Sequence, residues 1–501
     1  LLLLLLLLLL LLLLLLCARR GQLCTEGGGH RGEPHHNFGA VMMHGQMQGQ
    51  AGRLLRDHVR YVEVQVRAAA VPRVSAVPDQ LARYDGVARL HHHPVALQVV
   101  VPAVEPFGVS HAHEVRARSH LGPQAAAAEL AHSVFSSQRG SINMGVPERK
   151  QWRPEKLMLA AFNSLINLDE PLHRDMRMQQ SQFFFPAYVE TLRNKVGGKI
   201  DSMLDEMEEK GPVVDFVKMF SEELPMFTLC EMLGIDEQDR PKVKVWMHHL
   251  ELASQFLANP WQTFFSEPLF PFRFNKVMTD MFAYGQQVMA DRRLNPRDDL
   301  LTVIAQSQLE GELLSQEFLD GSWLLIIFAG NDTSRNSLSG TIRLMTEFQD
   351  QRAMVLDDPS LIPQMSEEAL RMVSPVMHMR RTATEDTVLN GQAIAKDEKV
   401  VLWYGAANRD PSIFPDPDTF NMHRDNVEKH IAFGHGVHKC LGSRVAKLQL
   451  RMAFERIFDR FPNIHWTGKQ KIAPNALVHA ISSLQVNLYG PNGKRPVKVA
   501  V

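Results

Sequence analysis

The chain has 501 residues, of which 45% are hydrophobic and 22% charged, and its formal net charge is -1 at pH 7. A chain of this length can fold as one large domain or as two or three ordinary ones, and its hydrophobic content supports a large core. The balanced charge argues against a nucleic-acid-binding protein, which usually carries a basic excess. The four cysteines are scattered and form no CxxC pair, so we expect neither a disulfide framework nor a zinc or iron–sulfur centre. We expect a reducing, cytoplasmic location.

The first part of the chain, residues 1–131, differs in composition from the rest. Residues 1–16 are all leucine, a run that is shorter than the roughly 20 apolar residues of a spanning helix and has no basic stretch before it. The first isoleucine is Ile142 and the first lysine is Lys150, whereas half of the histidines lie in residues 1–131. We hypothesise that this part is an atypical, mistranslated segment. The alternatives are a membrane anchor in the leucine run, which we do not favour, and a metal site at His91–His93.

Residues 132–501 have the pattern of a globular protein that is mostly helical. Residues 309–348 (LEGELLSQEFLDGSWLLIIFAGNDTSRNSLSGTIRLMTEF) predict a helical hairpin that leads into one long central helix, with Ser315 as a candidate N-cap. No sequence period of about 20–50 residues recurs, which argues against a solenoid.

Two later segments predict a helix and a β-hairpin. Residues 360–373 (SLIPQMSEEALRMV) have helical periodicity, and Pro375 ends the predicted helix because proline cannot continue it. Residues 386–404 (DTVLNGQAIAKDEKVVLWY) predict a short hairpin, because Asn390 and Gly391 are typical of a tight turn. The predicted fold class is therefore mainly α with a small β region.

The residues around Cys440 form a glycine-bounded loop before an amphipathic helix. Phe433, Gly436, Cys440 and Gly442 fit the pattern F-x-x-G-x-x-x-C-x-G. The glycines allow a tight turn and a close approach of the backbone to a flat ligand. An apolar stripe follows at helical spacing, formed by Leu441, Val445, Leu448 and Met452. We therefore expect Cys440 to lie at a helix N-terminus, where the helix dipole lowers the pKa of a thiol.

This loop resembles the haem-binding loop of the cytochrome P-450 monooxygenases. The resemblance implies that Cys440 ligates the iron of haem b as a thiolate, which favours cleavage of the O–O bond, and that Phe433 contacts the cofactor. It also implies the cytochrome P-450 fold, with the haem between a long central helix and the helix after the cysteine. The alternative is a buried structural cysteine beside a Gly-rich turn. A cysteine protease lacks support, because no paired His and Asn accompany Cys440.

The segment FAGNDTSRNS in the central helix resembles the oxygen-activation segment A-G-x-D-T of the same family. Ala329 and Gly330 are small and leave room for oxygen and substrate. Thr333 carries a hydroxyl that can loosen the helical hydrogen bonds and hold water, and Asp332 can relay protons. We therefore predict Asp332 and Thr333 as catalytic residues. The alternative is a helix with an exposed polar patch.

Glu368 and Arg371 match the E-x-x-R motif of the family, and their spacing places both side chains on one side of a helix. The resemblance implies that the pair is buried and is joined by Arg424, so that these three residues support the fold on the cysteine side. An exposed ion pair that contributes little to stability is the alternative.

Four basic residues match positions at which the family contacts the haem propionates, namely His173, Arg177, Arg381 and His438. His173 and Arg177 lie four residues apart on a predicted helix and so face one side. Arg381 lies ten residues after Arg371, and His438 belongs to the cysteine loop. Basic side chains suit carboxylates because they form charge-assisted hydrogen bonds with them.

The resemblance covers residues 132–501, and we recognise no counterpart of the family's opening helix and strands before them. It implies a monooxygenase that inserts one oxygen atom of O2 into an aliphatic C–H bond of a hydrophobic substrate, such as a terpenoid, a sterol side chain or an alkane. Since no G-x-G-x-x-G motif occurs and no flavin-binding segment follows Val501, we expect electrons from a separate ferredoxin and ferredoxin reductase. The alternatives are a haem-binding protein without turnover, a peroxygenase and an inactive chain.

The predicted substrate pocket is apolar. Its walls come from Leu325, Phe328 and Ala329, and from residues 374–379 (SPVMHM) and 256–265 (FLANPWQTFF). Such a pocket suits a hydrophobic molecule of modest polarity.

The helix after Cys440 also carries a predicted docking face. Arg444, Lys447 and Arg451 recur at helical spacing away from the apolar stripe. We expect this face to bind an acidic ferredoxin, and an ordinary solvated charged face is the alternative.

Overall fold

The computed structural model describes residues 125–126, 128–129, 131–139, 156–491 and 493. The chain divides into two compact units, Leu1–Asp85 and Gly86–Val501, and every described residue lies in the second unit. The leucine run and the histidine cluster lie outside the described residues, so the alternatives that rest on them stay hypotheses. Within the described part, we find no helix with the length and apolar character that crossing a membrane requires.

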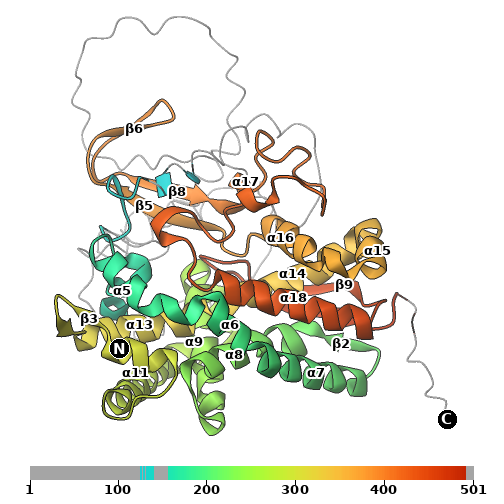
Figure 1. Ribbon diagram of the computed structural model, residues 1–501, viewed down its shortest axis with the longest axis horizontal. Coiled ribbons are helices and arrows are strands. Elements are labelled where there is room, and N and C mark those ends of the chain that lie inside the picture. Colours follow the sequence, from blue (N-terminus) through green and yellow to red (C-terminus); the bar gives the residue numbers. More distant parts are fainter. Residues whose placement is uncertain (1–124, 127, 130, 140–155, 492, 494–501) are drawn as a thin grey trace, which may run out of the picture. The chain divides into compact units, whose positions relative to one another are not determined.

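Helices form most of the described structure (Figure 1). They are α4 (Lys156–Phe162), α5 (Leu172–Gln180), α6 (Pro186–Thr191), α7 (Arg193–Lys210), α8 (Glu223–Leu233), α9 (Arg240–Ala258), α10 (Pro260–Ser266), α11 (Phe270–Leu294), α12 (Leu300–Gln306), α13 (Gln316–Ala329), α14 (Asp332–Glu347), α15 (Gln349–Asp357), α16 (Ile362–Val373), α17 (Tyr404–Ala407) and α18 (Ser443–Arg460).

The strands form small antiparallel sheets. They are β1 (Phe135–Ser136), β2 (Val213–Asp215), β3 (Gln308–Leu309), β4 (Glu312–Leu313), β5 (His378–Ala383), β6 (Thr387–Leu389), β7 (Gln392–Ile394), β8 (Lys399–Trp403), β9 (His465–Ile472) and β10 (Ile481–Asn487). One sheet has the order β1-β5-β8 and another β2-β10-β9, while β3-β4 and β6-β7 are hairpins. In Figure 1, β5 and β8 lie at the top, and α18 runs across the middle.

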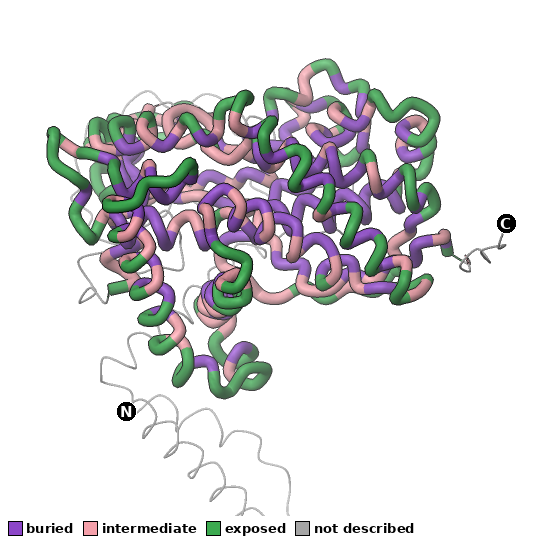
Figure 2. Tube along the Cα trace, turned by 60° about the horizontal axis from the view of Figure 1, so that its bottom comes forward, coloured by how far each residue is buried: buried purple, intermediate pink, exposed green. Residues whose placement is uncertain are grey.

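Apolar clusters hold the helices together, and the central pair α13 and α14 contributes to two of them. Leu338 and Ile342 of α14 pack with residues of α7, α16 and α18, whereas Trp323 and Ile327 of α13 pack with α9, α11 and α12. Figure 2 shows the buried residues on the inner turns of the tube and the exposed residues on its outer turns. Burying one large apolar side chain stabilises a fold by about 1.5–3 kcal/mol, so these clusters fix the central pair firmly.

The segment 309–348 differs from its prediction in two ways. The β-hairpin β3-β4 takes the place of the predicted helical hairpin, because Glu310 and Gly311 have positive φ angles of 53° and 85°, as a tight hairpin turn requires. The predicted long helix is interrupted at residues 330–331, between α13 and α14. Ser315 is the N-cap residue of α13, although its side chain makes no capping hydrogen bond.

Two other predicted elements are confirmed. The helix predicted for residues 360–373 is α16, and Ser374 ends it in a left-handed conformation directly before Pro375. The predicted hairpin is β6-β7, in which Asn390 and Gly391 have φ angles of 50° and 80°. The strand β8 that follows pairs with β5 rather than with this hairpin.

The described structure begins before the predicted boundary at residue 131. Ala125 and Ala128 are buried in an apolar cluster with Phe135 of β1 and with residues of β5 and β8. This short helical stretch therefore packs against the sheet, although it falls in the segment that we hypothesised to be mistranslated. Residues 1–124 lie outside the described residues, where that hypothesis is untested.

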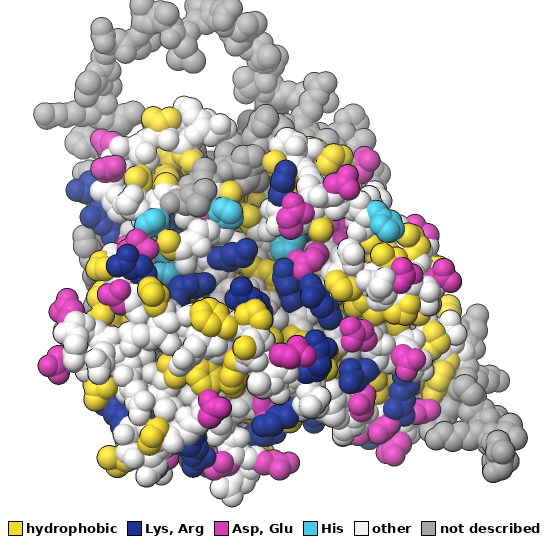
Figure 3. Space-filling model, in the orientation of Figure 1, with side chains coloured by type: hydrophobic (Ala, Val, Ile, Leu, Met, Phe, Trp, Pro, Cys, Tyr) yellow, Lys and Arg dark blue, Asp and Glu magenta, His cyan; other side chains and the backbone are white. Residues whose placement is uncertain are grey.

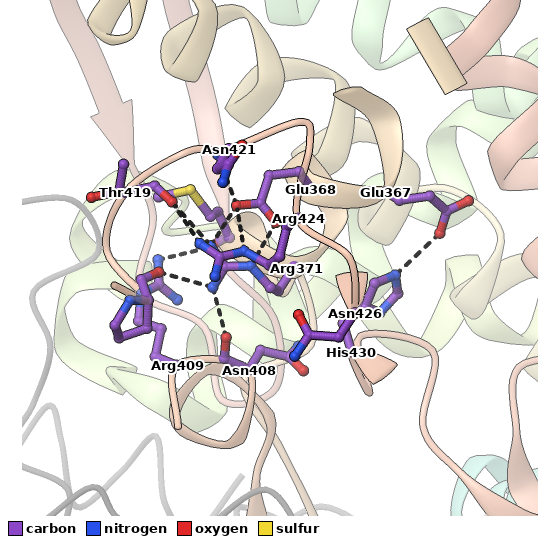
Figure 4. A network of polar contacts seen from close by, with 12 residues as sticks. Glu367, Glu368, Arg371, Asn408, Arg409, Thr419, Asn421, Arg424, Asn426 and His430 are labelled. Atoms are coloured by element: carbon purple, nitrogen blue, oxygen red, sulfur yellow. Dashed lines mark hydrogen bonds and ion pairs between the residues drawn. The ribbon is translucent and has the colours of Figure 1, made fainter. Parts of the chain in front are cut away.

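A buried ion network joins α16 to the segment that leads to the cysteine loop (Figure 4). Glu368 and Arg371 are 0% exposed, and two nitrogens of Arg371 donate to the two carboxylate oxygens of Glu368 at 2.7 and 2.8 Å. Arg424 donates from Nε to the same carboxylate at 3.3 Å, as the motif predicted. The two arginines also donate to the backbone carbonyls of Asn408, Pro415, Asp416, Pro417 and Thr419.

Removal of one member of this network should strongly destabilise the fold. We predict that Arg371→Met lowers the free energy of unfolding by about 3–5 kcal/mol, because the buried carboxylate of Glu368 loses its charge partner. Urea unfolding measures this loss. Arg193→Met is a matched control, because Arg193 and Glu190 form the same i,i+3 pair at 46% and 62% exposure; its unfolding curve should match the wild type. Equal, small effects in both variants would contradict the prediction.

Candidate active site

The cysteine loop turns tightly and presents Cys440 to solvent. Gly434 and Gly436 have positive φ angles of 69° and 63°, which glycine adopts without strain. The backbone N–H of Cys440 donates to the carbonyl of Phe433 at 2.8 Å and so closes the loop. Cys440 is exposed, whereas Cys230 is buried in the apolar cluster around α8 and α9. Of these two thiols, only that of Cys440 is open to a ligand.

Cys440 is exposed, but the protein around its thiol still affects the pKa of that group. Solvent reaches the residue, yet the surrounding protein desolvates the thiolate, and this burial raises the pKa of Cys440. A hydrogen bond from the backbone N–H of Gly442 and the charge of Arg177 act in the opposite direction. The predicted net lowering of this pKa is therefore wrong for the protein alone. The helix α18 begins only at Ser443, three residues after Cys440. Its dipole therefore lowers the pKa of the thiol by less than burial raises it.

The structure brings together four predicted basic residues near the cysteine loop. The rings of His173 and His438 lie 4.2 Å apart between centroids. Arg177 donates from Nη2 to the carbonyl of Lys439 at 2.6 Å, next to the cysteine. Arg381 and Arg177 are close enough for their charges to act on His438. Two arginines and two histidines thus lie near the cysteine loop.

Both histidines of this cluster are held in the neutral form. Burial, followed by the charge of Arg177, lowers the pKa of His173 to about 4. Burial, followed by the charge of Arg381, lowers the pKa of His438 to about 2. His438 is also hydrogen-bonded through Nε2 to Oγ of Ser137 at 3.1 Å. At neutral pH each of these imidazoles therefore offers one hydrogen-bond donor and one acceptor rather than a positive charge.

The donor set fits haem. Nδ1 of His173 is buried and has no hydrogen-bond partner among the described residues. An acceptor with negative charge would satisfy this atom and the arginines beside it, and a porphyrin with two carboxylates supplies such acceptors. The solvent-reached thiol of Cys440 is the matching ligand for iron. The unpartnered Nδ1 of His173, the two arginines and the exposed Cys440 are therefore consistent with this cofactor.

The predicted catalytic residues Asp332 and Thr333 form a second group, at the interruption of the central helix. The hydroxyl of Thr333 donates to the carbonyl of Ala329 at 3.2 Å, a bond that competes with the regular helical pattern. Ala329 is exposed although it lies on a helix packed into the core. The interruption therefore opens backbone and small side chains to solvent where the family segment A-G-x-D-T predicts the reaction.

Asp332 belongs to a buried ion cluster that reaches α9. Arg335 lies one turn along α14, 3.3 Å from Oδ1 of Asp332. It also donates two hydrogen bonds, both of 2.9 Å, to the carboxylate of Glu251 on α9. Burial raises the pKa of Asp332 to about 6; the charge of Arg335 opposes this rise and that of Glu251 adds to it. Asp332 is therefore poised to exchange a proton near neutral pH.

Sequence reasoning missed several residues of these two groups. Arg335 follows Asp332 by three positions, a helical spacing that signals pairing, but its partner Glu251 lies 84 residues away in the sequence. Ser137 and Glu129 contact the cysteine loop from more than 300 residues away. No sequence pattern in the chain indicates such distant contacts.

Comparisons with known proteins point to one family. The family model for Cytochrome P450 matches residues 356–487. Linalool 8-monooxygenase of Pseudomonas putida is 33% identical over 323 residues, which span 64% of this chain and 77% of that protein. The methyl-branched lipid omega-hydroxylase of Mycobacterium bovis is 32% identical over 359 residues, which span 70% of this chain and 79% of that protein.

A solved structure agrees with these relatives. Mycobacterium marinum cytochrome P450 CYP268A2, solved in complex with pseudoionone, superposes with a TM-score of 0.64 at 31% sequence identity. The match covers 73% of this chain and 85% of that chain.

The ion cluster around Asp332 predicts a measurable titration. In the wild type, the carboxyl stretch of Asp332 should titrate near pH 6 in infrared difference spectra against Asp332→Asn. In Glu251→Gln this pKa should fall, because a charge that raises it is gone and Arg335 is free to pair with Asp332 alone. Glu267→Gln, an exposed carboxylate after α10, should leave the titration unchanged. An unchanged or higher pKa in Glu251→Gln would contradict the proposed coupling.

Proposed function

The chain belongs to the cytochrome P450 family, and we propose that within it the chain hydroxylates aliphatic positions of hydrophobic molecules. It is a haem-thiolate monooxygenase whose cofactor is haem b, and its mainly helical fold with small sheets confirms the predicted fold class. The observation that carries the proposal is the exposed Cys440 with basic side chains near its loop, among which Nδ1 of His173 has no hydrogen-bond partner in the described structure.

Cys440 is the proposed ligand of the haem iron, and Phe433 is the proposed aromatic neighbour of the cofactor. The proposed contacts of the propionates are His173, Arg177, Arg381 and His438. The thiolate-bound haem supplies oxygen activation, in which one atom of O2 enters a C–H bond and the other leaves as water, with two electrons and two protons consumed. The protein's task is to hold the cofactor, orient the substrate and deliver the protons.

Asp332 and Thr333 are the proposed proton-delivery residues. The carboxyl of Asp332, with a pKa of about 6, both takes up and gives away a proton near neutral pH. The hydroxyl of Thr333 lies where the helical hydrogen bonds are interrupted, so it is able to hold a water molecule beside the exposed Ala329.

The substrate proposal rests on the apolar character of the interior residues that solvent still reaches. Leu325 and Phe328 of α13 and Met377 and Met379 around the start of β5 are half-buried, and none of them carries a charge. The backbone of Met377 is tied to Leu477, and Ile481, four residues later, is tied to Asn336 of α14. These contacts support the proposal that an apolar wall lies close to the proposed catalytic residues.

The names of the relatives favour one kind of substrate. One relative is named for linalool, another for methyl-branched lipids, and the similar solved structure contains pseudoionone. We therefore propose that this chain hydroxylates a terminal or side-chain carbon of a terpenoid, a sterol side chain or an alkane chain.

Electrons are proposed to come from a ferredoxin and its reductase, which dock on the cysteine side. Lys and Arg side chains gather across the middle of the face shown in Figure 3, where α5, α6 and α18 lie in Figure 1. Of the predicted residues on α18, Arg444 is exposed, while Lys447 and Arg451 pair with Glu367 at 2.8 and 3.4 Å. Arg444 therefore offers more available charge to an acidic partner than the other two.

The thiolate assignment has a direct spectroscopic test. Cys440→Ala should lose the red-shifted band of the ferrous–CO complex, because only a thiolate ligand produces that band. Cys230→Ala, the matched change at a buried thiol, should keep it. A red-shifted band that persists in Cys440→Ala would refute the assignment.

Substrate titrations test the proposed substrate class. Linalool, a sterol and a medium-chain alkane should be added to the ferric protein while the haem spectrum is followed. At least one of them should convert the spectrum toward the high-spin form, because an apolar ligand displaces water from the iron. Binding of a small charged aromatic compound, with no response to these three, would contradict the proposed class.

The docking proposal predicts that electron transfer from an acidic ferredoxin slows as salt rises. Arg444→Glu should slow it more than Arg451→Glu, because Glu367 already neutralises part of the charge of Arg451. The rate of reduction of the haem protein, measured by stopped flow at several ionic strengths, gives both effects. Arg273→Glu, an exposed charge reversal on α11, is the control and should leave the rate unchanged. A rate that is insensitive to salt and to Arg444→Glu would count against this face.

A further inference from the structure

Glu129 is a buried carboxylate to which no sequence motif pointed. It is 3% exposed and lies in the short helical stretch before β1. Its carboxylate accepts hydrogen bonds from the hydroxyl of Tyr404 and from the backbone N–H of His435. It also pairs with the guanidinium of Arg381, at 3.4 Å between Oε1 and Nη2. One side chain therefore joins the start of α17, the strand β5 and the cysteine loop.

The fit between Glu129 and the cysteine loop explains one glycine of that loop. Gly434 has a φ angle of 69°, and a Cβ atom there would lie 3.3 Å from Oε2 of Glu129 and 3.5 Å from Oη of Tyr404. A side chain at this position would be strained in its backbone and crowded by the carboxylate. The path of the loop toward Cys440 and the position of Glu129 therefore depend on each other.

Glu129 also balances the charge of Arg381. The guanidinium of Arg381 is joined to the cysteine loop through Glu129, whose carboxylate also accepts a hydrogen bond from the backbone N–H of His435. Its Nη1 donates to the carbonyl of Arg380 at 3.0 Å, and its Nη2 faces Glu129. In a buried ion pair, removal of one partner leaves the other uncompensated. Glu129 thus restricts the orientation of Arg381 and offsets part of its charge.

We propose that Glu129 is a positioning residue of the haem site, which holds Arg381 in place for a haem propionate and lowers the reduction potential of the haem iron. The proposal rests on the proposed role of Arg381 at that propionate. Reduction from the ferric to the ferrous state adds one electron, and a fixed negative charge nearby opposes this addition. Inside a protein, where the dielectric constant is low, such a charge acts over a longer distance than in water.

Glu129→Gln tests the charge with little change in size. The reduction potential of the purified haem protein, measured by spectroelectrochemical titration, should shift to a more positive value. Haem transfer to excess apomyoglobin should become faster, because Arg381 is less firmly held. Glu385→Gln is the matched control, because Glu385 lies just after β5, the strand that carries Arg381, but is exposed, so that water screens its charge. A wild-type potential in Glu129→Gln would overturn the proposal.

Arg381→Gln separates the failure of this inference from the failure of the proposed role of Arg381. It should shift the potential to a more negative value and accelerate haem transfer. No change in either quantity would show that Arg381 does not act on the haem, and both proposals would fall. A negative shift in Arg381→Gln with no shift in Glu129→Gln would overturn the inference about Glu129 alone.

If Glu129→Gln does not fold with haem, two milder variants test the positioning role of Glu129. Glu129→Asp keeps the charge and shortens the side chain, and Tyr404→Phe removes one hydrogen bond to the carboxylate. Both should keep the wild-type potential and release haem faster. Haem release at the wild-type rate in both variants would overturn the positioning role.

Discussion

The buried ion pair between Glu368 and Arg371 is the constraint on which the cysteine loop depends. Two charges at 0% exposure are tolerable only where their hydrogen-bonding capacity is filled, so backbone carbonyls must come to Arg371. Asn408 supplies one of them, and its side chain accepts from the backbone N–H of Ile431 at 2.7 Å. Ile431 lies directly before the loop that holds Cys440. The hydrogen bonds of Arg371 therefore fix Asn408, and Asn408 in turn fixes the start of the loop that holds Cys440.

The basic residues near the cysteine loop, unlike the pair Glu368 and Arg371, are not fully matched by carboxylates. His173, Arg177, Arg381 and His438 lie near the cysteine loop, and burial keeps the two histidines neutral, so the positive charge there comes from the two arginines. Glu129 is a carboxylate of the chain itself that meets this cluster, through Arg381. The unpartnered Nδ1 of His173 favours an anionic cofactor, because a buried polar atom without a partner costs about 1–3 kcal/mol. The same side chains that disfavour the empty site therefore favour a porphyrin with two carboxylates.

Sequence reasoning succeeded where a function depends on residues that are close together in the chain. The turns of the loop around Cys440 and the turn at Asn390 follow from local backbone preference, whereas the burial of the pair Glu368 and Arg371 was expected from the resemblance to the family. It failed for residues 309–313, where a glycine turn outweighed the helical pattern of the flanking residues. It also failed for the pKa of Cys440, because burial by distant parts of the chain outweighed the local helix dipole. Glu129 could not be found at all, since its partners lie more than 250 residues away.

The interruption of the central helix changes both the hydrogen bonds and the charges around Asp332 and Thr333. An unbroken helix would direct the carbonyl of Ala329 into its own hydrogen-bond ladder, whereas here the hydroxyl of Thr333 shares it. The helix α14, which follows the interruption, carries Asp332 and Arg335. The guanidinium of Arg335 forms ion pairs with both Asp332 and Glu251 of α9. Because one cation serves two carboxylates, the charge felt by Asp332 depends on the distance from α9 to α14. The proton affinity of the proposed relay is therefore coupled to the packing of a helix that does not itself contain the relay.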